Sequence, residues 1–99
     1  MNQKLKAQWV KALRSGEYQQ LQPGRSSWTK HGRHCCLGVL AELKELDTSP
    51  TSDLRSKFVS FGIPRDALDL LVRMNDGNEF DNTRRHSFAE IADYIEKNL

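Results

Sequence analysis

The run CCLGVLAELKEL, residues 35–46, constrains the fold more than any other part of the chain. Its apolar side chains recur at the spacing of one helix face, at Cys36, Val39, Leu40, Leu43 and Leu46. Leu37 and Ala41 widen that face, so a helix here is apolar over much of its circumference. Such a helix needs neighbours on several sides. The sequence therefore predicts a central helix at about residues 36–46, with other helices packed around it.

Four other segments can supply those neighbours. Residues 3–15 are amphipathic, residues 54–61 carry a short apolar face, and residues 64–74 are apolar over much of their girth. The last segment, residues 87–99, opens with Ser87-Phe88-Ala89-Glu90, the pattern of a capping box. A chain of 99 residues builds one modest core. We predict a mainly α single domain, residues 1–99, of four to five helices.

Two stretches lack a regular apolar pattern. Residues 17–34 contain the turn signals Pro23-Gly24 and Gly32, and they are longer than the usual connection between elements. This length predicts either a short β-hairpin within residues 17–34 or a functional loop. Residues 76–86 form a second polar loop before the last helix.

Two histidines and two cysteines, His31, His34, Cys35 and Cys36, stand at the start of the predicted central helix. The histidine spacing would suit a metal, but adjacent helical side chains point about 100° apart, so the two thiols do not converge. Cys36 also belongs to the apolar face. The helix start beside Arg33 and His34 predicts a lowered pKa for Cys35. We therefore expect no catalytic residue, no metal and no cofactor. A zinc or thiol-redox protein centred on Cys35 and Cys36 ranks third, behind the two binding functions described below.

The charges divide unevenly along the chain. Residues 1–34 carry seven basic side chains and one acidic, whereas residues 35–99 carry eight basic and twelve acidic, for a net charge of +2. Such a division indicates either a binding surface for an anionic partner or an attraction between the two portions within the fold. Both interpretations stay open at this point.

Four pieces of the chain together resemble a known group of sequences. They are KAQWVKALRSGEY (6–18), CCLGVLAEL (35–43), RMND (73–76) and SFAEIADYIEKNL (87–99). The combination resembles a family of short proteins encoded by tailed bacteriophages and prophages. The resemblance implies an accessory protein that acts in the bacterial host cytoplasm and binds or inhibits a host enzyme or defence complex. It assigns no catalytic residue.

The first functional hypothesis is therefore a non-enzymatic protein that binds a bacterial host or defence protein through the two loops. Aromatic and arginine side chains often anchor such interfaces. The candidate partner-binding residues are Arg25, Trp28, Lys30, Arg33, Arg84 and Arg85. The alternative is a nucleic-acid-binding accessory protein that uses the first helix and the 17–34 loop. Its candidate contacts are Lys4, Lys6, Lys11 and Arg14.

No membrane partner is expected, because no apolar run approaches the ~20 residues that span a bilayer. The first residues also lack the apolar stretch of a signal peptide. We therefore expect a cytoplasmic protein whose two cysteines stay reduced.

Overall fold

The computed structural model describes residues 1–20, 29–30, 32–48, 53–77 and 84–99, with residues 29 and 30 described by their backbone. The prediction of a mainly α domain is confirmed within these ranges. The helices are α1 (Gln3–Arg14), α2 (Cys36–Leu43), α3 (Leu54–Ser60), α4 (Arg65–Asp76) and α5 (Phe88–Asn98). The strands are β1 (Gln19–Gln20), β2 (Thr29–Lys30) and β3 (Arg33–His34).

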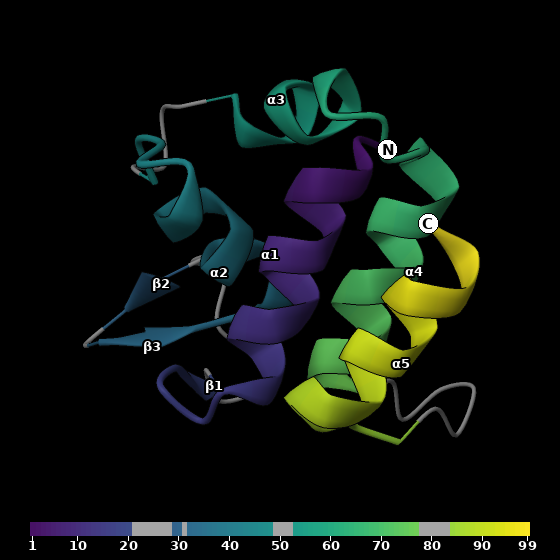
Figure 1. Ribbon diagram of the computed structural model, residues 1–99. Helices are drawn as coiled ribbons and strands as arrows, with labels where there is room; N and C mark the ends of the chain where they lie inside the picture. The colour runs from purple at the N-terminus through teal and green to yellow at the C-terminus, as the bar shows by residue number, and fades with distance from the viewer. Residues whose placement is uncertain (21–28, 31, 49–52, 78–83) are drawn as a thin grey trace.

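Helix α1 lies between α2 on one side and α5 on the other (Figure 1). Helix α4 packs against both α2 and α5, and α3 crosses the top of the domain in this view. The small sheet lies beside the start of α2. This arrangement leaves one face of α1 uncovered along its whole length, and the candidate site lies on that face.

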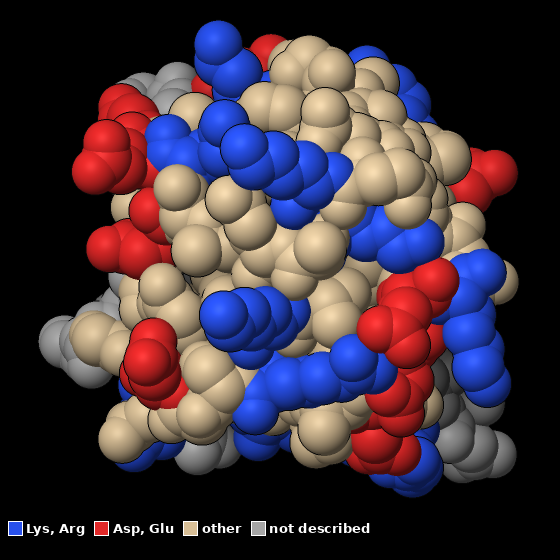
Figure 2. Space-filling model, viewed as in Figure 1, with Lys and Arg blue, Asp and Glu red and all other residues tan. Residues whose placement is uncertain are grey.

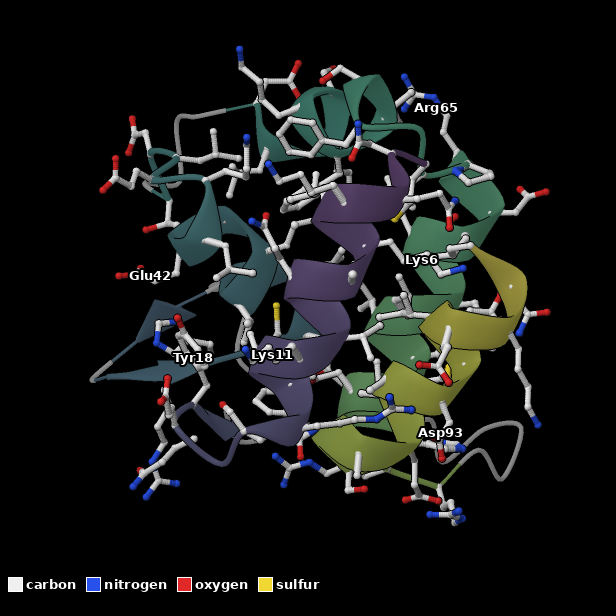
Figure 3. The ribbon with its side chains drawn as sticks, viewed as in Figure 1. Lys6, Lys11, Tyr18, Glu42, Arg65 and Asp93 are labelled. Carbon is white, nitrogen blue, oxygen red and sulfur yellow. The ribbon has the colours of Figure 1, made fainter. Side chains whose placement is uncertain are left out.

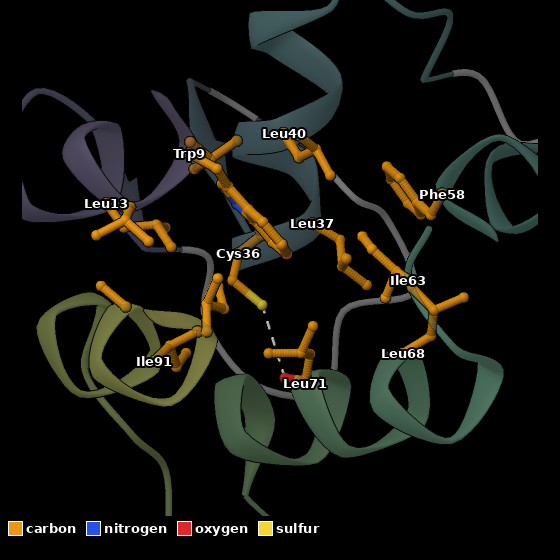
Figure 4. Packing of buried hydrophobic residues seen from close by; sticks show 14 of the residues in the cluster. Trp9, Leu13, Cys36, Leu37, Leu40, Phe58, Ile63, Leu68, Leu71 and Ile91 are labelled. Carbon is orange, nitrogen blue, oxygen red and sulfur yellow. Dashed lines mark hydrogen bonds between the residues drawn. The ribbon is translucent and has the colours of Figure 1, made fainter. Parts of the chain in front are cut away.

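Helix α2 supplies the predicted centre of the core, because its residues from Cys36 to Ala41 are all buried. Trp9 of α1 is fully buried against it, and its Nε1 donates a hydrogen bond of 2.9 Å to the carbonyl of Cys36. The Cys36 thiol in turn donates to the carbonyl of Leu71 in α4, at 3.6 Å (Figure 4). Helices α1, α2 and α4 are thus joined at one buried point.

Helix α2 ends at Leu43, three residues before the predicted end. Glu45 adopts a left-handed backbone with φ of 53°, and the amide of Leu46 donates to the carbonyl of Ala41 at 2.9 Å. This is the pattern of a Schellman cap, in which a glycine normally takes the left-handed position. Because a glutamate occupies it here, no glycine marks the end of the helix in the sequence.

The predicted hairpin within residues 17–34 is confirmed. Strands β2 and β3 pair antiparallel, with Thr29 opposite His34 and Lys30 opposite Arg33. A further strand, β1, pairs parallel with β3 and completes the order β1-β3-β2. This parallel pairing was not predicted, because a strand of two residues has no periodicity to detect.

The helix starts follow their sequence signals closely. The hydroxyl of Ser87 accepts from the amide of Glu90, and the Glu90 carboxylate accepts from the amide of Ser87, so the predicted capping box is confirmed. Asp53 caps α3 by accepting from the amide of Ser56. Pro64 occupies the N-cap position of α4 without a side-chain capping bond, one residue before the predicted position in the first turn.

Candidate functional site

The two thiols have separate structural roles. The Sγ of Cys35 accepts a hydrogen bond of 3.2 Å from the amide of Gly38 and so caps α2, whereas Cys36 points into the core. Burial raises the pKa of Cys35 to about 11 and raises the pKa of Cys36 as well. The prediction of a lowered Cys35 pKa is wrong, because burial of the thiol outweighs the amides at the helix start.

Of the two histidines in the predicted cluster, the structure describes His34. The ring of His34 lies edge-on to the ring of Tyr18, with 5.4 Å between their centroids. His31 lies outside the described residues. Among the residues that are described, no three histidine, cysteine or acidic side chains are placed to hold a metal ion together.

A buried asparagine joins the bases of the two predicted loops. Asn75 is 1% exposed, and its Oδ1 accepts from the amide of Cys36 at 3.2 Å and from Nε2 of Gln20 at 3.0 Å. The same Gln20 nitrogen donates to the carbonyl of His86 at 2.8 Å. The described ends of both loops therefore lie side by side, on a polar network that sequence reasoning missed. The only feature of the sequence that marks this network is Asn75-Asp76, where the predicted helix of residues 64–74 stops.

The predicted partner-binding residues of these loops are placed in different ways. Arg33 is exposed on β3. Arg84 forms a two-pronged ion pair with Glu90, and Nε of Arg85 donates to the carbonyl of Asn75 at 3.2 Å. Arg25, Trp28 and the side chain of Lys30 lie outside the described residues. Arg84 thus supports the start of α5, whereas Arg85 bonds to the end of α4.

The predicted nucleic-acid contacts lie together on α1. Lys4, Lys6, Lys11 and Arg14 are its only charged residues, and the helix contains no acid. Figure 2 shows basic side chains spread over this face, with acidic side chains gathered at its edges. Figure 3 shows Lys6 and Lys11 projecting from α1, with Lys6 on the side of α5. We call this surface, Lys4 to Arg14, the α1 face.

Arg14 differs from the three lysines. Its Nη2 lies 2.6 Å from Oδ1 of Asp93, and its Nη1 lies 2.9 Å from Oε2 of Glu96, both on α5. These hydrogen bonds, first with Glu96 and then with Asp93, raise the pKa of Arg14. Across the described part of the chain, no carboxylate forms an ion pair with Lys4, Lys6 or Lys11. The lysines are therefore the available cations of the α1 face.

Hollows border the α1 face on both sides. One, of about 670 Å³, lies between α1 and α5, with Ala7 and Val10 in its floor and Lys6 and Lys11 beside them. We call it the α1–α5 groove. A second hollow, of about 480 Å³, lies toward α2 and α3 and brings Lys4 together with Lys44 and Phe61. The sequence had indicated the lysines of α1 but neither the groove floor nor Lys44.

None of the helices in the described ranges is long and apolar enough to cross a bilayer. No curated protein and no solved structure shows a significant match to the chain. One family model does match, over residues 1–70, which run from α1 into α4 and include the α1 face. The chain therefore belongs to the family described as a domain of unknown function, DUF8296.

Proposed function

We propose that this chain is a non-enzymatic accessory protein, encoded by a phage or prophage, that binds and modulates a bacterial host or defence protein. One observation supports it above the others: the α1 face presents Lys4, Lys6 and Lys11 without acidic partners, between hollows that a partner can fill. The resemblance of the CCLGVLAEL and SFAEIADYIEKNL segments to phage proteins supports the origin. The family match gives no information about this origin.

The chemistry of the thiols supports a role without catalysis. Cysteine enzymes act through a thiolate, usually activated by a neighbouring base. Burial keeps both Cys35 and Cys36 protonated at neutral pH, and both are engaged in holding α2 in place.

A nucleic acid is the second candidate partner, because α1 contains four basic residues and no acid. Two features weigh against it. Arg14 is already paired, and the carboxylates of Asp93 and Glu96 at that end of the face would repel a continuous phosphate backbone. No aromatic side chain for base stacking lines the described α1–α5 groove.

The test is a pull-down of the tagged full chain from bacterial lysate, with and without nuclease, read by mass spectrometry. The test variant is Lys4→Gln/Lys6→Gln/Lys11→Gln, and the matched control, Lys57→Gln/Arg65→Gln/Lys97→Gln, removes three exposed positive charges elsewhere. We expect one stoichiometric protein that survives nuclease, is lost with the test variant and is retained by the control. Loss of every partner after nuclease would overturn the proposal in favour of nucleic acid.

A further inference from the structure

The α1–α5 groove combines an apolar floor with positively charged walls, and together they determine the chemistry of an occupant. Its floor is apolar, formed by the exposed methyl group of Ala7 and by Val10, which is 6% exposed. Its walls carry the ammonium groups of Lys6 and Lys11, which have no carboxylate partner among the described residues. An occupant must therefore offer apolar side chains to the floor and carboxylates to the walls.

The spacing of the lysines fits a helical occupant. Lys6 and Lys11 are five residues apart on α1, which corresponds to a rise of about 7.5 Å along the helix axis. Five residues also turn about 140° around α1, so Lys6 and Lys11 flank the floor from opposite sides. A partner helix would meet them with acidic residues on the two stripes that flank its apolar stripe. Apolar residues on the adjoining stripe of the same partner helix would then face Ala7 and Val10.

The far end of the groove sets the charge order of the occupant. Glu96 lines that end, and with Asp93 it holds the Arg14 guanidinium. A carboxylate of the partner is therefore favoured beside Lys6 and Lys11 and disfavoured beside Glu96.

We propose that the α1–α5 groove is the docking site for an acidic amphipathic helix of the partner protein, with its apolar stripe on Ala7 and Val10 and its carboxylates on Lys6 and Lys11. This inference rests on the proposed function and adds the chemistry of the partner. The α1 face alone could serve many anionic partners, whereas an apolar floor between basic walls selects a protein helix over a polyphosphate chain.

The probe is a fluorescent synthetic helical peptide with leucine at i, i+3, i+4 and i+7 and glutamate on the flanking stripes. A scrambled peptide of the same composition and a single-stranded oligonucleotide serve as comparisons. Affinity is read by anisotropy at about 150 mM salt, and the contact surface by amide chemical shifts of the full chain. We expect the patterned peptide to bind at least tenfold more tightly than the scrambled one and to shift amides of α1 and α5.

Two variants separate the floor from the walls. Ala7→Glu fills the floor at an exposed position and should lower the affinity for the patterned peptide about tenfold. Lys6→Gln/Lys11→Gln should lower it about fivefold, whereas the control Lys57→Gln/Lys97→Gln should leave it unchanged. Equal binding of both peptides, tighter binding of the oligonucleotide, or full affinity in Ala7→Glu would each overturn the inference.

The pull-down distinguishes failure of this inference from failure of the proposed function. If Ala7→Glu still captures the same nuclease-resistant protein while the triple lysine variant does not, the groove is not the docking site and the proposed function stands. If neither the parent chain nor Ala7→Glu captures a protein after nuclease, the proposed function fails with it.

Discussion

Asn75 is the buried side chain on which the junction of the two loops depends. Its Oδ1 satisfies the amide of Cys36 and the amide of Gln20, and its Nδ2 donates to Asp76 at 2.9 Å. Asn75→Ala leaves the buried amide of Cys36 without this acceptor and removes one of the two acceptors of Gln20 Nε2. Each buried unsatisfied group costs about 1–3 kcal/mol. We expect the free energy of unfolding to fall by about 3 kcal/mol in urea denaturation. Asn98→Ala, at an exposed position, should change it by less than about 0.5 kcal/mol.

The thiols give a second prediction at the residue scale. With a pKa of about 11, Cys35 is roughly one part in ten thousand thiolate at pH 7. Alkylation of the native chain followed by mass spectrometry should therefore be much slower than alkylation of the chain in denaturant. Cys35→Ser should preserve stability, because serine is a preferred helix cap. Rapid labelling of Cys35 in the native chain would contradict the capping role.

The adjacent cysteines also mark a limit of sequence reasoning at this scale. The apolar stripe correctly placed Cys36 in the core. The pKa of Cys35 was predicted in the wrong direction, because proximity to Arg33 and His34 in the sequence says nothing of burial. Burial of Cys35 depends on the packing of the helix start against the rest of the fold, which no local pattern contains.

The start of α5 carries a pH-dependent contribution to stability. Hydrogen bonds from Arg84, and then from the amide of Ser87, lower the pKa of Glu90 from its ordinary 4.5 to about 2. A carboxylate with a lowered pKa in the folded state stabilises the fold above pH 4.5, and this contribution is lost as the pH falls from 4.5 toward 2. Glu90→Gln should therefore flatten the fall of the melting temperature over that range. The exposed Glu42→Gln variant should retain the full pH dependence.

The end of α2 gives a test of the left-handed residue that sequence reasoning missed. Glu45 has a φ of 53°, a conformation that costs a residue with a side chain roughly 1–2 kcal/mol and glycine little. We expect Glu45→Gly to raise the free energy of unfolding by about 0.5–1 kcal/mol. Glu42→Gly, inside the helix, should lower it by about 1 kcal/mol. A loss of stability in Glu45→Gly would argue against the Schellman cap.

At the same scale, the elements that the sequence predicted are those with a helical period or a cap. The capping box of α5, the Asp53 cap of α3 and the apolar faces of α1 and α4 were all readable locally. Strand β1 was not, since its pairing joins Gln19 to Arg33 and is set by the tertiary fold. Periodicity therefore identified the helices, whereas the strand order depends on pairings between residues far apart in the sequence.

At the scale of the whole molecule, the uneven division of charge has two consequences together. Arg14, from the basic portion, pairs with Asp93 and Glu96, which lie 79 and 82 residues further along the chain. The two portions thus attract each other at one end of the α1 face, while Lys4, Lys6 and Lys11 stay available. The basic residues are visible in the sequence, but only the fold determines which of them pair with a carboxylate.

Helix α5 completes the core that residues 1–70 begin. The family match ends at residue 70, within α4, whereas α5 lies against α1 and buries Phe88, Ile91, Ala92 and Ile95. A chain of residues 1–70 would expose the α1 surface that α5 covers and would lack the end of α4 with Asn75. We therefore expect the fragment of residues 1–70 to show no cooperative thermal transition by circular dichroism, in contrast to residues 1–99. A cooperative transition and dispersed amide resonances for residues 1–70 would show that α5 is an addition to a self-sufficient core. The α1–α5 groove would then be a feature of the full protein, outside the part that matches the family.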